Sequence, residues 1–184
     1  MKTAHGPINC LYPMPLVLVG SMVDGIPNYM ANAHVGIMDF ASISVSVGKN
    51  YHTNSGIKAT QTLSVNIPSV DLVEQADYCG LTSGKRTDKS ALFTTFYGTL
   101  STAPMIVECP VTMECALRET VEFPNHSVFI GEIVNTYYDD HLLTGGVLDL
   151  AKVQPILFHL NDKGYWSIGE RIATAWNVGQ SLKS

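Results

Sequence analysis

Positive side chains are scarce in this sequence, yet three of them stand close together. Lys85, Arg86 and Lys89 lie within residues 83–90, which read SGKRTDKS, although the whole chain of 184 residues holds only 11 Lys and Arg. Glycine lets backbone amides approach an anion, hydroxyl groups donate hydrogen bonds, and lysine supplies a formal charge. The segment therefore has the chemistry to bind a phosphate. The alternative is a solvated loop with ordinary surface charges.

A second segment carries polar groups without any charge. Residues 27–34 read PNYMANAH and bring two amides, a tyrosine and a histidine directly after a turn. An amide offers both a donor and an acceptor, which suits the alternating nitrogen and oxygen edge of a heteroaromatic ring. The alternative is a turn and strand edge whose asparagines satisfy their own backbone.

Two further positions could contact a ligand. A short predicted helix begins after a predicted strand, and its start carries Thr53, Asn54 and Ser55. These side chains could bind a phosphate, or they could only cap the helix. His126 precedes the apolar run that begins at Val128. A single histidine there is either a ligand or a structural residue.

Several common enzyme motifs are missing from the sequence. It has no G-x-G-x-x-G, H-E-x-x-H or G-x-S-x-G pattern, and residues 80–86 imitate a P-loop with a spacer that is one residue short. The six histidines are scattered singly, so their spacing indicates no metal site. The four cysteines form no C-x-x-C pair or zinc pattern, which favours buried, reduced thiols. They are Cys10, Cys79, Cys109 and Cys115.

The elements that would position these residues are mostly strands. Period-two alternation or dense Val, Ile, Thr and aromatic content predicts strands. Short helices are expected from Asn54 through Thr62, from Ser69 to about Tyr78, and after Thr87 or Asp88. The helices are few, and strands and helices do not alternate regularly, which favours a mainly β barrel over a doubly wound parallel sheet. We expect one domain, residues 1–184. The predicted strands are 16–23, 42–47, 63–67, 111–121, 128–138 and 156–160. The first is followed by the turn Asp24-Gly25, and the third stops at Pro68.

The charge balance narrows the class of protein. Charged residues make up 15% of the chain, and 11 positive against 16 negative side chains give a net charge of −5. A typical soluble domain carries about 25% charged residues. A disordered chain would be richer in charge and a nucleic-acid binder would be basic, so neither class fits. No segment reads as membrane-spanning or as a signal peptide, and we expect a cytoplasmic protein.

Several motifs, taken in order, resemble one known family. P-N-x-M at residues 27–30, V-N-I-P at 65–68, S-G-K-x-x-D-K at 83–89 and F-I-G-E at 129–132 are its main elements. With them the sequence resembles the flavin reductase-like, FMN-binding split-barrel family, and within it the flavoredoxin branch. The resemblance covers residues 10 to 170 approximately. It implies a six-stranded antiparallel split barrel, a homodimer, and noncovalent FMN in a groove at or near the subunit interface.

The resemblance also implies roles for particular residues. Asn28 would contact the flavin ring, and His34 stands where the family often has a tryptophan. Thr53, Ser83, Lys85 and Lys89 match positions around the phosphate and ribityl chain, His126 matches a cofactor-side histidine, and Phe158 or His159 matches an aromatic residue near the ring. The full set of expected cofactor-binding residues is Asn28, Tyr29, Met30, Ala31, His34, Thr53, Ser83, Lys85, Lys89, His126, Phe158 and His159.

The expected activity follows from the cofactor. The flavin would carry the redox chemistry, so no side chain is predicted to act catalytically and no metal is needed. The main expectation is an NAD(P)H-dependent flavin oxidoreductase that moves a hydride to bound FMN. The alternative is a flavoredoxin-type carrier that keeps FMN bound and exchanges electrons with a redox protein partner. A third, weaker alternative is a flavin- or haem-binding relative without turnover.

A dimer would also explain the low charge. Obligate interfaces resemble a core cut in half, so a chain that hides much of its outside against a partner needs fewer charges.

Overall fold

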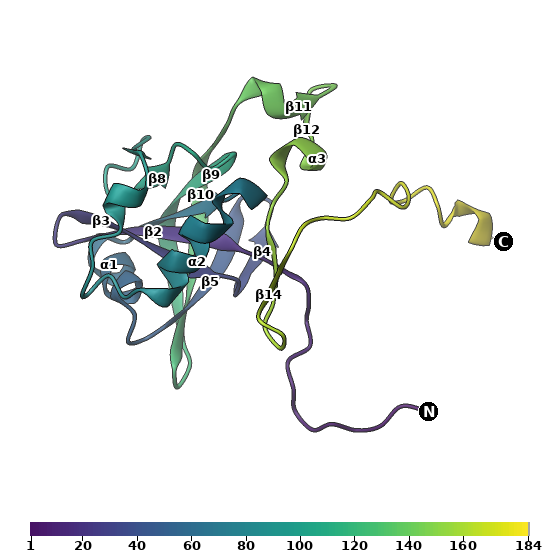
Figure 1. The fold of residues 1–184 in the computed structure, drawn as a ribbon, viewed down its shortest axis with the longest axis horizontal. Helices are drawn as coiled ribbons and strands as arrows, with labels where there is room; N and C mark the ends of the chain where they lie inside the picture. The colour runs from purple at the N-terminus through teal and green to yellow at the C-terminus, as the bar shows by residue number, and fades with distance from the viewer. Residues whose placement is uncertain (184) are drawn as a thin grey trace.

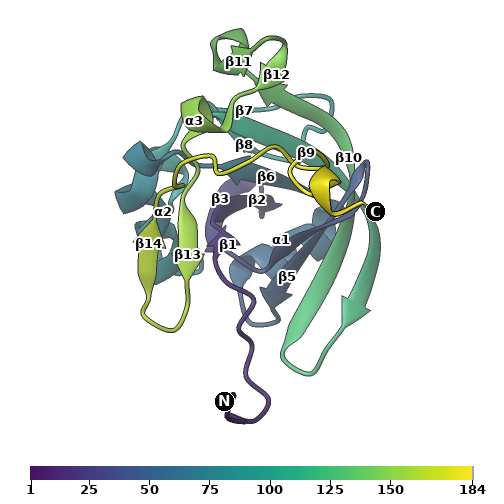
Figure 2. The same ribbon diagram turned by 90° about the vertical axis from the view of Figure 1, so that its right-hand side faces the viewer.

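Seven antiparallel strands form the main sheet of the structure, a computed structural model that describes residues 1–183 (Figure 1). Ser184, the last residue of the expected domain, lies outside the described residues. The sheet has the order β3-β2-β6-β9-β10-β5-β4, with β3 and β4 at its edges. It curls into an open barrel (Figure 2). Its strands are β2 (Val17–Val23), β3 (Ile26–Asn32), β4 (Val35–Asp39), β5 (Ser42–Gly48), β6 (Thr62–Ile67), β9 (Val111–Glu122) and β10 (His126–Tyr138).

Smaller elements surround this sheet. The helices are α1 (His52–Thr60), α2 (Val73–Leu81) and the single turn α3 (Leu150–Val153). The short strands are β1 (Met14–Pro15), β13 (Leu157–His159) and β14 (Gly164–Trp166) in one sheet, β7 (Thr95–Phe96) with β8 (Met105–Ile106), and β11 (Leu143–Thr144) with β12 (Val147–Leu148). The mainly β, split-barrel class is confirmed. The described residues carry seven strands in the main sheet where the resemblance implied six.

The strand predictions are confirmed because the alternation of the sequence matches the pleat of the sheet. In β5, Ile43, Val45 and Val47 are buried inside the barrel. Asp24 and Gly25 have φ angles of 50° and 79°, the left-handed conformation that a two-residue hairpin requires, and they join β2 to β3.

The predicted helix boundaries need correction. Asn54 does not cap the first helix, which begins at His52 after Tyr51 and ends at Thr60, followed by Gln61 in a left-handed conformation. The Asn54 side chain instead donates to the carbonyl of Val47 at 3.1 Å, so it ties the helix to β5.

The other two predicted helices are shifted or shortened. Ser69 precedes a 3₁₀ turn, Val70–Leu72, which leads into α2, and α2 continues past Tyr78 to Leu81. The third predicted helix is a single 3₁₀ turn, Ser90–Leu92.

Apolar side chains pack on both faces of the sheet. Inside the barrel, Ile57 of α1 packs with a cluster that includes Val45 and Phe129. On the outer face of β2 and β3, Leu18 and Tyr29 pack under α2 in a second cluster. Residues of β3 therefore alternate between the two faces, and this alternation decides which of them can reach a ligand.

Three of the four cysteines match the prediction of buried thiols. Cys79, Cys109 and Cys115 are buried, whereas Cys10 is exposed, so the prediction is wrong for Cys10. Burial raises the pKa of Cys79 to about 11 and that of Cys115 to about 12, so these thiols stay protonated at neutral pH.

A buried carboxylate fixes the loop that covers the outer face of the barrel. Glu114 of β9 is fully buried and accepts hydrogen bonds from the backbone N–H of Thr99 at 3.0 Å and of Leu100 at 2.6 Å. Asn135 and Tyr137 of β10 donate to the same carboxylate at 2.8 and 2.6 Å. The carboxylate thus joins two strands to the chain between β7 and β8.

Within residues 1–183, no helix is both long enough and apolar enough to cross a membrane.

Candidate functional site

A cavity of about 260 Å³ lies where three segments of the chain meet. The segments are β3, the start of α1, and the loop that follows α2, here called the cation loop (residues 82–89). The lining residues are Asn28, Met30, Asn50, Tyr51, His52, Thr53, Cys79, Gly80, Leu81, Thr82, Ser83, Gly84, Arg86 and Lys89. They include two positive side chains and no carboxylate, so the cavity favours an anionic group.

The start of α1 adds donors to this cavity. The first N–H groups of a helix have no partner within the helix, and its dipole places partial positive charge there. Within the described residues, Tyr51 at the N-cap position supplies no side-chain cap. The backbone of His52 and Thr53 therefore offers an anion two groups of the kind that bind phosphate at helix starts.

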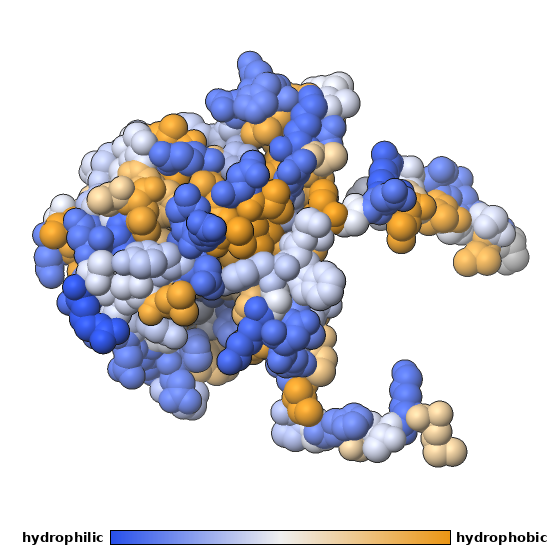
Figure 3. All heavy atoms as spheres, in the orientation of Figure 1, coloured by the Kyte–Doolittle hydropathy of each residue, from blue (hydrophilic) through white to orange (hydrophobic). Residues whose placement is uncertain are grey.

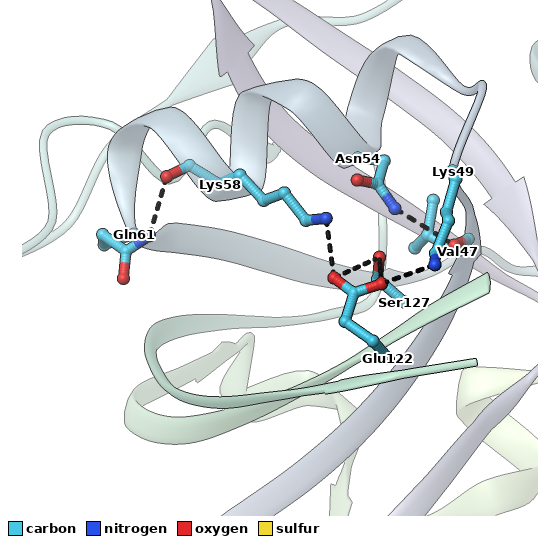
Figure 4. A network of polar contacts seen from close by, with 7 residues as sticks. All are labelled: Val47, Lys49, Asn54, Lys58, Gln61, Glu122 and Ser127. Carbon is cyan, nitrogen blue, oxygen red and sulfur yellow. Dashed lines mark hydrogen bonds and ion pairs between the residues drawn. The ribbon is translucent and has the colours of Figure 1, made fainter. Parts of the chain in front are cut away.

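Charged side chains tie α1 and the residues before it to β9. Glu122, at the end of β9, pairs with Lys58 of α1 at 2.8 Å and with Lys49 at 3.0 Å, and Ser127 donates to the same carboxylate (Figure 4). The hydrogen bonds from Lys58 and then Lys49 lower the pKa of Glu122 to about 2, so this carboxylate is ionised throughout the neutral range.

Asn28 links β3 to both other segments. Its Nδ2 donates to Thr53 Oγ1 at 2.8 Å, which joins the strand to the first turn of α1. Gly84 lies so close that a Cβ atom there would stand 2.0 Å from Asn28 Oδ1 and 3.0 Å from His52 Cδ2. The cation loop can therefore pack against β3 only because residue 84 has no side chain.

Lys89 anchors the cation loop. Lys89 is only 3% exposed, and its ammonium donates to the carbonyl oxygens of Cys79 at 3.1 Å and Thr82 at 2.9 Å. These carbonyls belong to the end of α2, where a positive charge is favourable. Burial lowers the pKa of Lys89, and within the described residues its third N–H has no hydrogen-bond partner. Lys89 thus shapes the site besides lining it.

Arg86 and Lys85 point in different directions although they are neighbours. Arg86 lines the cavity and also a second hollow of about 210 Å³ on the other side of Asn28 and Gly84. Lys85 is exposed and lines neither hollow. The cation-cluster motif therefore identifies a loop that lines the cavity, whereas the set of expected cofactor-binding residues omits Arg86.

Five of the residues predicted from sequence meet at this cavity: Asn28, Met30, Thr53, Ser83 and Lys89. Tyr29 and Ala31 face the opposite side of β3 and pack in the second cluster, under α2. The Tyr29 hydroxyl is 2.7 Å from Thr95 Oγ1, and burial raises its pKa strongly, so its phenol is an internal structural group.

The other predicted residues lie in two separate places. The rings of His34 and His126 are 6.2 Å apart, beyond the end of β3. Phe158 of β13 packs beside Tyr165, with ring centres 5.6 Å apart. His159 faces the other side of β13, where its Nδ1 is 2.9 Å from Asp162 and its ring is 4.8 Å from that of Tyr12.

The open seven-stranded barrel and its anion-favouring cavity define the class of protein as a split barrel with a candidate phosphate site. The comparison with family models is more specific. A model described as the flavin reductase like domain matches residues 9–163, and the chain belongs to this family. The resemblance inferred from the sequence motifs is thereby confirmed.

Solved structures and a curated relative agree with this family. The flavoredoxin of Methanosarcina acetivorans is 40% identical with a TM-score of 0.93, over 99% of this chain and 98% of that one. The flavoredoxin of Desulfovibrio vulgaris (Miyazaki F) is 36% identical with a TM-score of 0.90, over 98% of this chain and 100% of that one. An uncharacterised protein of Archaeoglobus fulgidus is 29% identical over 139 residues, 73% of this chain and 78% of its own length.

Proposed function

We propose that the chain is a flavoprotein that binds FMN noncovalently, with the phosphate in the cavity between β3, the start of α1 and the cation loop. The observation that carries this proposal is the lining itself, which joins Arg86 and Lys89 to an uncapped helix start and contains no carboxylate. A phosphate needs this combination of charge and N–H donors.

The rest of the cofactor would lie along β3. The side chains at alternate positions 28, 30 and 32 lie on the same face of this strand. His34 follows the strand, and its ring is 6.2 Å from that of His126. Asn28 Oδ1 and Met30 offer a polar and an apolar contact, which suits a ribityl chain and the edge of a ring. Asn32 is already engaged, because its Nδ2 donates to the carbonyl of Ser46 at 3.0 Å.

The activity we propose is transfer of a hydride from NAD(P)H to bound FMN. The flavin supplies the redox chemistry, and the chain's own residues bind the phosphate, orient the ring and limit water around it. Membership in the flavin reductase-like family supports this reading. A second candidate is an electron carrier that keeps FMN bound, and it is favoured by the similarity to two flavoredoxins over nearly their whole length.

Steady-state oxidation of NADH and NADPH, with FMN added to the full chain, separates the two candidates. The enzyme reading predicts turnover with at least one of the two nucleotides. If neither is oxidised but a reduced redox protein such as a ferredoxin reduces the bound flavin in rapid mixing, the carrier reading replaces it.

Arg86→Ala is expected to weaken FMN binding by about 10-fold. A charge-assisted hydrogen bond to phosphate contributes roughly 1.5–3 kcal/mol, and because Arg86 is exposed we expect the lower end of this range. Lys85→Ala removes the neighbouring charge outside the cavity and is expected to change the affinity by less than about 2-fold. Fluorescence titration of FMN at fixed ionic strength measures both. Equal effects of the two substitutions would mean that the phosphate does not occupy this cavity.

We also propose that the chain works as a single-domain homodimer in the cytoplasm. The low charge content supports the dimer, because a surface that is buried against a partner carries few charged residues, and only 15% of this chain is charged.

A further inference from the structure

The last part of the chain leaves the body and exposes apolar side chains. After β14, residues 169–183, here called the C-terminal arm, run away from the barrel (Figure 1), and all of them are exposed. Ile172 and Trp176 are 99% and 96% exposed, and Leu182 is 87% exposed. Residues 172–182 contain no charged side chain. A segment of this composition is unfavourable in water unless it packs against something.

The arm is structured although it stands apart from the body. The guanidinium of Arg171 donates to Thr174 Oγ1 at 2.9 Å, and the backbone N–H of Val178 donates to the Thr174 carbonyl at 3.1 Å. Within residues 1–183, every hydrogen bond found for residues 171–183 joins two residues of that segment. The arm therefore presents its apolar side chains in a fixed turn, and its own barrel does not cover them.

A matching surface exists on the barrel. An apolar groove of about 790 Å³ lies between the open end of the barrel and the edge strand β4. Two of its lining residues are open to solvent: Ile37 is 89% exposed and Phe40 is fully exposed. The residues that line the groove are Pro15, Val17, Val35, Gly36, Ile37, Met38, Asp39, Phe40, Ser42, Ile43, Val65, Ile67, Met113 and Ile133, of which only Asp39 is charged.

The two surfaces are complementary in chemistry and lie on one side of the molecule. The apolar face of the body in Figure 3 is on the side from which both terminal segments project, and Figure 2 looks onto this side. An exposed edge strand with apolar residues associates with other chains unless it is covered. A second copy that lies against this side would meet the groove and the arm together.

We propose that two copies of this chain exchange C-terminal arms, so that the arm of each copy packs in the apolar groove of the other. The inference rests on the proposed homodimer and adds the contact that holds it. The interface is isologous, because groove meets arm twice across a two-fold axis. The arm's uncharged residues 172–182 form the contact, and the charged residues Glu170, Arg171 and Lys183 lie at its margins.

The test compares the full chain with Ile172→Ser/Trp176→Ser in analytical ultracentrifugation over a range of concentrations. The full chain is expected to be a dimer, and the double substitution to raise its dissociation constant by roughly 100-fold or more, because two large side chains are lost from each of two contacts. Glu170→Gln/Lys183→Gln, in the same arm, is the control and should leave the dissociation constant within about 2-fold. Circular dichroism checks that each variant keeps its fold.

Two results would overturn the proposal in different ways. A full chain that stays monomeric at all concentrations excludes both the dimer and the arm exchange. If the Ile172→Ser/Trp176→Ser chain has an unchanged dimer dissociation constant, the arm exchange is excluded, but the proposed homodimer is not. FMN titration of the same samples reports on the proposed function separately.

The fluorescence of Trp176 gives a second, independent readout. The sequence contains two tryptophans, so in Trp166→Phe only Trp176 emits. Arm exchange predicts blue-shifted emission at dimer concentrations that moves to the red on dilution, as Trp176 returns to water. Emission that is fully red at every concentration would contradict the exchange, and blue emission that persists in the monomer would mean that the arm folds onto its own groove.

Discussion

Gly84→Ala is expected to reduce FMN affinity by roughly 100-fold, the equivalent of about 3 kcal/mol. The new Cβ would stand 2.0 Å from Asn28 Oδ1, and Asn28 cannot simply turn away because it is buried and bonded to Thr53. The cation loop must therefore move away from β3, and Arg86 moves with it. Isothermal titration with FMN measures the loss.

The matched control is Gly169→Ala, at a glycine with no atom within 4 Å of the Cβ position. This variant should bind FMN like the unaltered chain. Because the cation loop is at the surface, Gly84→Ala should keep the cooperative unfolding of the parent. Tight FMN binding by Gly84→Ala would show that the loop does not need its present position to form the cofactor site.

Glu114→Ala is expected to lower the free energy of unfolding by about 3–5 kcal/mol. The substitution leaves four donors without their acceptor: the backbone N–H groups of Thr99 and Leu100, and the side chains of Asn135 and Tyr137. Urea unfolding measures the change. Glu119→Ala, an exposed glutamate on the same strand, is the control and should cost less than about 0.5 kcal/mol.

The same carboxylate predicts a pH dependence. Burial opposes the ionisation of Glu114, but the hydrogen bonds from Tyr137, Asn135, Leu100 and Thr99 outweigh it and lower the pKa from the ordinary 4.5 to about 2. A lowered folded-state pKa stabilises the fold above pH 4.5, and this contribution is lost as the pH falls toward 2. Glu114→Gln should remove that part of the acid sensitivity. An unchanged acid-unfolding profile in Glu114→Gln would contradict this role.

The strands could be predicted from the sequence because their signal is local. The alternation in residues 42–47 and the Asp24-Gly25 turn both depend on neighbouring residues, and both are confirmed. The same alternation assigns residues 28–31 to two faces of a strand. In any strand, Asn28 and Met30 face one side, and Tyr29 and Ala31 face the other. The structure follows this rule, with Asn28 and Met30 at the cavity and Tyr29 and Ala31 in the cluster under α2.

The roles of the basic residues could not be predicted in this way. The motif places a cation cluster at residues 85–89, but which cation enters a cavity depends on how the loop packs against α2 and β3. Lys89 is turned inward by two carbonyls near the end of α2, whereas Lys85 remains outside. Glu114 gives even less signal, because its two backbone partners lie 14 and 15 residues away in an irregular loop.

The most direct test of the cofactor proposal is the visible spectrum of the full chain after addition of FMN and gel filtration. We predict flavin absorbance that elutes with the protein at about one FMN per chain, and that falls in Gly84→Ala under the same conditions. Protein fractions without flavin absorbance, with all of the FMN in the small-molecule volume, would contradict the proposal.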